Sequence, residues 1–394
     1  MEKEIKLADR AECTGCMACH DACPTNSIFA IFDGLHRIPQ INADSCIQCG
    51  KCQSVCAPLQ GLKKNNSQEE FSPVYLCAWN EDSNERFNAT SGGVGGALAK
   101  YAIESGWFVC GAAFDDNWRL SHIISNNASI IDRIRGSKYL QSDTTGCYKE
   151  IITLLKQGEK VLFFGTPCQT EAVRRLIPSS LRQNLLTCEI ICHGVNSPIV
   201  WDGYKNYVEN KYKSHLTSYN FRSKSKGWGK LRVSYSFQNG KKVDEAAFQN
   251  IFHSWFGQHY MMRESCFHCK FRTEERYSDI VIGDFWGIET IEPSLDVKDG
   301  ASVLIVNSEN AKQFVSKANL YTKIIDALKA KSVIKGFVDK MPEEVKSMQI
   351  DRMKKFSEDY LHHPFEYMTA KLYPRVTVLE KYFNSILYHL HLKK

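Results

Sequence analysis

The stretch Cys13-Thr-Gly-Cys16-Met-Ala-Cys19-His-Asp-Ala-Cys23-Pro24 returns with the same cysteine spacing as Cys46-Ile-Gln-Cys49-Gly-Lys-Cys52-Gln-Ser-Val-Cys56. Half of the sixteen cysteines of the chain lie in these two runs. Cysteines three residues apart around a tight loop can place three sulfurs at three corners of one cube, and the fourth sulfur then comes from the partner run. The spacing therefore predicts two [4Fe-4S] clusters near the N-terminus.

This spacing is typical of bacterial two-cluster ferredoxins, in which the last cysteine of each run binds the other cluster. One predicted ligand set is Cys13, Cys16, Cys19 and Cys56, and the other is Cys46, Cys49, Cys52 and Cys23. Structural zinc is disfavoured because a third cysteine followed by x3-Cys is not a zinc spacing. Disulfides fit poorly because the charged N-terminal stretch lacks the apolar core of a signal peptide.

The whole chain has 394 residues, of which 43% are apolar, and this length predicts two or three domains with ordinary cores. No apolar run approaches the length of a membrane span. Many cysteines without a secretion signal favour a reducing, cytoplasmic location. Residues 311–394 hold 16 Lys and Arg against 9 Asp and Glu. A solvated helical surface is favoured there over an acidic partner, a nucleotide or an anionic membrane, and no nucleic-acid-binding module is visible.

The order of strand and helix patterns predicts the domain organisation. A hairpin around Asp33-Gly34 completes an α+β ferredoxin-like module at residues 1–60, followed by a polar linker at 61–72. Strand patterns that alternate with helical ones predict an α/β domain, divided into regions 73–155 and 156–310. Residues 311–394 are expected to form a basic, mostly helical extension.

A third cysteine group is predicted in the α/β domain. Cys266-x2-Cys269 supplies two thiols at ligand spacing, whereas Cys168 and Cys192 each lie just after a strand pattern. Ligands gather where strands of open α/β sheets end. We expect these four thiols to hold a third [4Fe-4S] cluster, with Cys188 as a competing donor and zinc or free thiols as alternatives. The thiols expected to be plain core residues are Cys77, Cys110 and Cys147.

Two further motifs are candidates for anion or flavin binding. Ser91-Gly92-Gly93 opens a helix, where backbone N–H groups could cradle a phosphate or glycines could permit close packing. Arg222 and Lys224 precede Trp228, a combination that suits a flavin or anionic ligand, although an exposed hairpin is the alternative. Asp284 ends a strand and could face a ribose or ring nitrogen, or cap the next turn.

Taken in order, seven motifs between about residues 74 and 310 resemble those of a known family, the beta subunits of coenzyme F420 hydrogenases and dehydrogenases. They are Ser91-Gly-Gly, Gly136-Ser-Lys-Tyr139, Gly165-Thr-Pro-Cys-Gln169, Cys192-His-Gly-Val195, Phe221-Arg-x-Lys224, Cys266-x2-Cys269 and Asp279-x4-Asp284-Phe-Trp-Gly. The resemblance implies FAD and at least one [4Fe-4S] cluster, and it implies that Ser91, Gly92, Gly93 and Lys138 contact the flavin or its phosphates. Regions 73–155 and 156–310 then correspond to the N-terminal and C-terminal parts of the family.

The resemblance and the ferredoxin-type module together imply an FAD- and 4Fe-4S-dependent oxidoreductase. Single electrons from a donor protein or redox enzyme would be collected for a two-electron substrate, either coenzyme F420 or a polysaccharide-pathway metabolite. The alternatives are an electron-relay subunit of a larger complex and a scaffold without flavin. The sequence identifies no catalytic residue, leaves the direction of electron flow open, and is compatible with a homo-oligomer.

Overall fold

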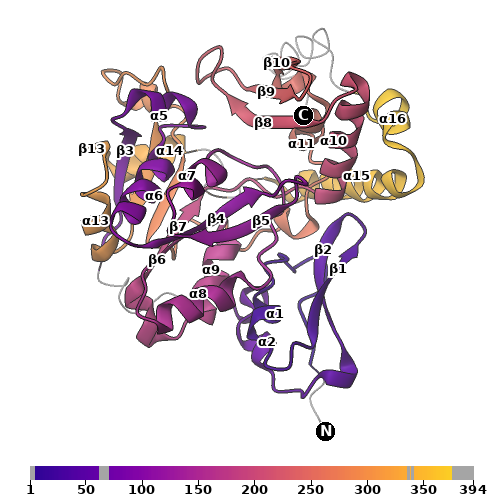
Figure 1. Ribbon diagram of the computed structural model, residues 1–394, viewed down its shortest axis with the longest axis horizontal. Helices are drawn as coiled ribbons and strands as arrows, with labels where there is room; N and C mark the ends of the chain where they lie inside the picture. Colours follow the sequence, from indigo (N-terminus) through magenta and orange to yellow (C-terminus); the bar gives the residue numbers. More distant parts are fainter. Residues whose placement is uncertain (1–4, 62–70, 335–337, 339–340, 375–394) are drawn as a thin grey trace.

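The computed structural model describes residues 5–61, 71–334, 338 and 341–374. Its centre is a mixed eight-stranded sheet in the order β13-β3-β12-β11-β7-β6-β4-β5 (Figure 1). The predicted α/β architecture is therefore confirmed. The strands are β3 (Val74–Asn80), β4 (Phe108–Phe114), β5 (Leu120–Ser125), β6 (Val161–Gly165), β7 (Leu185–Ile190), β11 (Ile280–Asp284), β12 (Ser302–Val306) and β13 (Leu320–Ile324).

Helices cover both faces of this sheet, which is why β6 and β12 are buried at every position. One face carries α6 (Val94–Glu104), α7 (Ser129–Ile134) and α13 (Glu309–Val315). The other carries α8 (Cys147–Lys156), α9 (Pro167–Leu176), α12 (Ile288–Ile291) and α14 (Ala327–Val333). The short α5 (Ser83–Asn88) follows β3.

The N-terminal module contains the expected hairpin, formed by β1 (Ile28–Asp33) and β2 (His36–Ile41). Its helices are α1 (Ala18–Ala22), α2 (Lys51–Ser54) and α3 (Ala57–Gln60). Figure 1 shows the module, in indigo, beside α8 and α9 of the large sheet domain. Most of the predicted linker, residues 62–70, lies outside the described residues.

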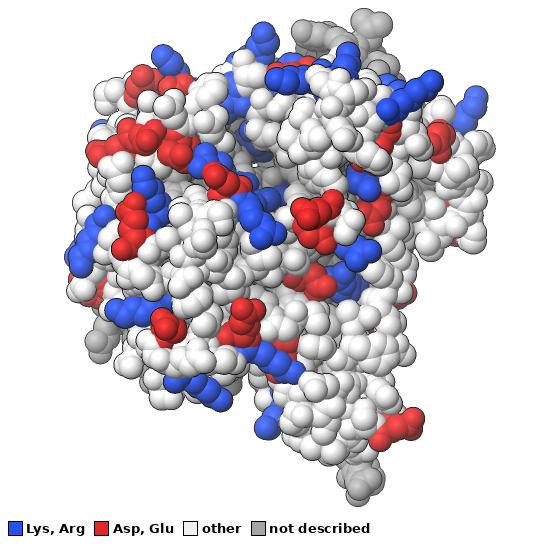
Figure 2. Space-filling model, viewed as in Figure 1, with Lys and Arg blue, Asp and Glu red and all other residues white. Residues whose placement is uncertain are grey.

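A second, antiparallel sheet is formed by β8 (Leu216–Ser223), β9 (Arg232–Phe237) and β10 (Lys242–Ala246). It packs with α10 (Pro198–Tyr212), α11 (Ile251–Gly257) and α15 (Glu343–His362) around buried aromatic side chains that include Trp201 and Phe356. Figure 2 shows a hollow between this sheet and the large sheet, with Lys and Arg side chains at its rim and mixed charges elsewhere on the same face.

The region after residue 311 differs from the mostly helical extension that the sequence predicts. Residues 320–324 form strand β13, which pairs with β3 at the edge of the large sheet. The helices α14, α15 and α16 (Phe365–Tyr367) and a π-helical turn at Met368–Leu372 then follow. Alternating exposure along β13 leaves little apolar signal for an edge strand. Residues 375–394 lie outside the described part of the chain, in which no helix is long and apolar enough to cross a membrane.

Candidate functional site

Three neighbouring strands of the large sheet run in the same direction and end at one edge. The parallel registers pair Gly165 of β6 with Glu189 of β7, and Ile190 of β7 with Ile282 of β11. Cys168, Cys192 and Asp284 consequently lie at or just beyond adjacent strand ends. This carboxyl edge is where open α/β sheets bind ligands.

The four cysteines of the predicted third group come together at this edge. Burial raises the pKa of Cys192 well above its usual value, and the nearby thiolates of Cys266, Cys168 and Cys269 raise it further. Burial likewise raises the pKa of Cys168, Cys266 and Cys269 to about 11. Buried thiolates need a compensating positive charge, which bound iron supplies. The donor set therefore fits a thiolate-bound cluster, and we call it the third set.

Cys188 lies apart from the third set. It is fully buried in the middle of β7, and after burial the charges that raise its pKa are those of Glu189 and Asp279 rather than of thiolates. Cys192 and Cys188 are the alternative ligands that the sequence offers for the third cluster, and Cys192 is the one beside Cys266. The predicted core cysteines, Cys77, Cys110 and Cys147, are buried as well.

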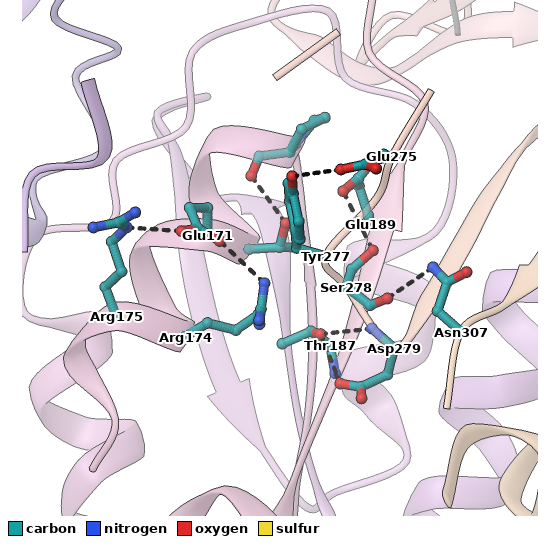
Figure 3. A network of polar contacts seen from close by, with 12 residues as sticks. Glu171, Arg174, Arg175, Thr187, Glu189, Glu275, Tyr277, Ser278, Asp279 and Asn307 are labelled. Atoms are coloured by element: carbon teal, nitrogen blue, oxygen red, sulfur yellow. Dashed lines mark hydrogen bonds and ion pairs between the residues drawn. The ribbon is translucent and has the colours of Figure 1, made fainter. Parts of the chain in front are cut away.

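Polar contacts near β7 lie within α9 and join the segment at residues 278–279 to the strand (Figure 3). Glu171 of α9 accepts from Arg174 at 3.0 Å and from Arg175 at 2.7 Å, within the helix that carries Cys168. Arg276, which follows the Cys269 loop, donates to Glu189 of β7 at 2.9 Å. Burial nevertheless raises the pKa of Glu189 to about 7, because the charge of Arg276 only partly offsets desolvation.

The N-terminal cysteines separate into the two sets that the spacing predicts. Burial raises the pKa of Cys19 well above its usual value, and the thiolates of Cys16, Cys13 and Cys56 raise it further. Cys56 therefore joins the first run, and we call this group the inner set.

The outer set contains the remaining ferredoxin-type cysteines. Cys23, Cys46, Cys49 and Cys52 line one cavity together with Pro24 and several isoleucines. Burial opposes a charged Cys23, but hydrogen bonds from Thr25 and Ser27 outweigh it, and the net effect lowers the pKa of this thiol.

No group of three or more His, Cys, Asp or Glu side chains among the described residues converges closely enough to hold a single metal ion. Thiolates around a cubane cluster bind four separate iron atoms, so they stand further apart than the ligands of one zinc ion.

The inner set lies directly against the third set. After burial, the Cys168 thiolate is among the causes that raise the pKa of Cys16 to about 11. Thr14 lies beside both sulfurs and partly opposes the effect of burial on the pKa of each thiol. Thr144 also donates to the carbonyl oxygen of Cys16 at 2.8 Å.

A buried carboxylate fastens the module to the large domain. Both oxygens of Asp21 accept backbone N–H groups at the start of α8, from Gly146 at 2.8 Å, Tyr148 at 2.9 Å and Lys149 at 3.3 Å. A carboxylate at a helix N-terminus satisfies orphan donors and complements the helix dipole. The two parts of the chain therefore share one fixed interface.

The candidate flavin residues lie at the same edge as the third set. Arg222 donates through Nη1 to Asp284 and to the Tyr139 hydroxyl, each at 3.1 Å, whereas its buried Nη2 has no partner among the described residues. Trp228 donates to the other oxygen of Asp284 at 3.2 Å and stacks on Trp286 with ring centroids 4.1 Å apart. An unpaired guanidinium nitrogen beside stacked aromatics fits an anionic or flavin-like ligand.

The other candidate flavin residues already have protein partners. Lys224 donates to the carbonyl oxygens of Arg86, Ser91 and Asp299, and Lys138 donates to three carbonyl groups between residues 133 and 136. All three donors of each ammonium group are thus engaged, so both lysines hold loops. The phosphate contact that the resemblance implies for Lys138 stays a prediction.

The Ser91-Gly92-Gly93 turn follows the close-packing alternative. The Ser91 hydroxyl donates to the Ala301 carbonyl at 2.7 Å. A Cβ on Gly92 would lie 2.5 Å from the Ala78 oxygen, so two backbones meet there. Gly93, at a φ of +82°, turns the chain into α6. Only the N-terminal backbone of α6 is left as a possible contact to a phosphate.

Sequence reasoning missed the residues that join the two parts of the chain, chiefly Thr14, Asp21 and Arg263. Arg263 is 2% exposed and donates to the Cys13 carbonyl at 2.8 Å, across 250 positions of sequence. The visible signal was that the first run has Thr14, Gly15 and Asp21 where the second run has Ile47, Gln48 and Ser54.

Comparisons with known proteins identify the family. Residues 75–147 match the N-terminal region of the coenzyme F420 hydrogenase/dehydrogenase beta subunit, and residues 158–332 match its C-terminal region. The chain belongs to this family. Residues 5–58 match a 4Fe-4S dicluster domain, so the predicted iron–sulfur module is also confirmed.

Two curated relatives of the family share part of the chain. A subunit of the F(420)H(2) dehydrogenase of Methanosarcina mazei is 21% identical over 46% of this chain and 53% of its own length. The coenzyme F420-dependent sulfite reductase of Methanocaldococcus jannaschii is 28% identical over 43% of this chain and 26% of its own length. The chain thus spans about half of the first relative and a quarter of the second. A chain of the F420-reducing [NiFe] hydrogenase complex from Methanosarcina barkeri is similar with 18% identity and a TM-score of 0.43, over 76% of this chain and 95% of that one.

Proposed function

We propose that this chain is an iron–sulfur flavoprotein oxidoreductase that takes single electrons through three [4Fe-4S] clusters to FAD and serves a two-electron substrate. The proposal rests mainly on one observation: Arg263 donates to the carbonyl of Cys13 in the inner set and accepts the N–H of Cys266 in the third set. Clusters supply one-electron steps and a flavin supplies the two-electron step. Coenzyme F420 is the proposed substrate class, with a polysaccharide-pathway metabolite as the alternative.

The chain's own residues have three roles in this proposal. The outer set faces solvent through Cys49 and would meet an electron donor, and the inner set would pass charge to the third set. Arg222, held by Asp284 and Tyr139, would present Nη2 to the flavin. Trp228 and Trp286 would supply an aromatic wall, and the α6 N-terminus would receive a phosphate.

Flavin retention tests the proposal. We expect anaerobically purified native chain to contain FAD, and Arg222→Met to retain about tenfold less, because a charge-assisted hydrogen bond contributes ~1.5–3 kcal/mol. Iron content should not change. Arg232→Met is the matched control, since Arg232 pairs with Asp244 on the neighbouring hairpin. Native chain with full iron but no bound flavin would refute the flavin part.

A second candidate is an electron-relay subunit without a substrate of its own. Two observations favour it: one relative is named as a subunit, and the chain spans only part of the relatives it matches. Turnover of coenzyme F420 by the isolated chain with a reduced donor separates the two functions. Flavin-loaded chain that is reduced but never turns over would support the relay subunit.

A further inference from the structure

Arg263 is a buried guanidinium between the inner set and the third set. Its Nε donates to the Cys13 carbonyl at 2.8 Å, and its Nη1 donates to the Arg37 carbonyl at 2.8 Å and to Oε1 of Gln141 at 3.1 Å. Its own carbonyl accepts the N–H of Cys266 at 3.0 Å. One residue thus touches the ligand loops of both sets.

Among the residues that the structure describes, none supplies a carboxylate partner for the charge of Arg263. Its side-chain hydrogen bonds within the described residues go to two backbone carbonyls and one amide oxygen. Burying a cation without an anion is costly. Arg263 lies between the two ligand loops, since it donates to the Cys13 carbonyl and its own carbonyl accepts the N–H of Cys266. Because cysteines of both loops adjoin these contacts, we take their thiolates as the anions that offset the charge of Arg263.

The loop around Gly15, in the first cysteine run, leaves room for the Arg263 guanidinium. A Cβ on Gly15 would lie 2.8 Å from Nη1 of Arg263 and 2.2 Å from the amide nitrogen of Gln141. The equivalent position of the outer run is Gln48, which has nearly the same left-handed φ, 53° against 65°. The backbone at this position thus accepts a side chain. Glycine is needed in the inner run because Arg263 and Gln141 occupy the space.

We propose that Arg263 is the shared counter-charge of the inner and third clusters, a positioning residue that joins their ligand loops and raises their reduction potentials. The inference rests on the proposed function for the third cluster. A thiolate-bound cluster becomes more negative on reduction, so a fixed positive charge in a water-poor site favours the reduced form.

A redox titration of the full-length holoprotein, followed by electron paramagnetic resonance, tests the proposal. In Arg263→Met we expect the equilibrium constant for reducing the inner or third cluster to fall about tenfold or more, which is about 59 mV for one electron. The outer cluster should keep its potential. Arg263→Lys, which keeps the charge, should stay within about threefold of native. Arg37→Met is the control, because it removes a nearby guanidinium that pairs with Asp143.

Unchanged potentials in an Arg263→Met protein with full iron would overturn the proposal. If that variant loses iron, Arg263→Gln keeps two donors without the charge and takes its place. A tenfold change in the equilibrium constant for cluster reduction in Arg263→Lys with full iron would also overturn the proposal, since that variant keeps the positive charge. Native iron near roughly eight atoms per chain would refute the third cluster separately. The inner potential would still measure the effect of Arg263.

Discussion

The two cysteine runs share one spacing but lie in different surroundings. The inner set is buried against the large domain, where Cys16 faces Cys168. The outer set is at the far side of the module, where Cys49 is exposed and Ile47 is 62% exposed. Two runs with the same cysteine spacing thus have different neighbours, which implies that their clusters lie at different positions along an electron path.

The residues between the cysteines account for this difference. Thr14 of the inner run contacts two sulfurs, whereas its counterpart Ile47 faces solvent. Asp21 caps α8 through three N–H groups, whereas its counterpart Ser54 only donates to a carbonyl of its own helix. Cysteine spacing determines that a cluster can form, and the intervening side chains determine what lies beside it.

The largest expected effect concerns the buried cap. Asp21→Ala leaves three N–H groups at the start of α8 without acceptors, and we expect the free energy of unfolding to fall by ~2–4 kcal/mol. Ser54→Ala at the equivalent position should change it by about 0.5 kcal/mol or less. Denaturant unfolding under anaerobic conditions, followed by cluster absorbance, measures both. Equal losses of unfolding free energy in the two variants would show that Asp21 stabilises the first run no more than Ser54 stabilises the second.

The second-largest expected effect is a loss of unfolding free energy through overpacking at Gly15. Gly15→Ala puts a methyl group against Arg263 and Gln141, and we expect a loss of ~2 kcal/mol through overpacking. Gln48→Ala keeps the same backbone conformation with open surroundings, so its loss should be within about 0.5 kcal/mol. The same unfolding measurement compares them. Similar losses of unfolding free energy in the two variants would contradict the close packing of Gly15 against Arg263 and Gln141.

The smallest expected effect is a pH dependence of stability at His36, where the N-terminal module meets the large domain. Burial, with the charges of Arg263 and Arg10, lowers the pKa of His36 well below its usual value. The unfolded chain therefore binds a proton first, near pH ~6.5, and stability that is full above that pH is lost as the pH falls toward the folded-state pKa. His36→Gln should weaken this acid loss relative to native protein. The control His215→Gln, at an 84% exposed side chain, should not. An unchanged pH profile in His36→Gln would contradict the assignment.

Much of the fold could be predicted because its signals are local. Cysteine spacing gave the inner and outer sets, and buried apolar runs gave the central strands. Cys188 and Cys192 differ by four positions in sequence, and only the extent of β7 separates a core thiol from one beyond the strand end. Strand β13 was missed because an edge strand buries too little of its side chains.

The candidate site was harder to predict because charge alone does not specify a partner. Lys138 and Lys224 both lie in motifs that suit a phosphate, but each uses its donors on backbone carbonyls. Arg263 lies in no cysteine run, and its contact with Cys13 depends on how two domains pack. Such long-range contacts leave no periodic pattern in one sequence.

Iron and acid-labile sulfide, quantified in anaerobically purified native chain and in Cys266→Ser, test the central claim most directly. Three clusters predict about twelve iron atoms per native chain and about eight in Cys266→Ser. Cys188→Ala, which changes a thiol outside the third set, should keep about twelve. A native content of about eight atoms, unchanged by Cys266→Ser, would contradict the relay from the inner set to the third set.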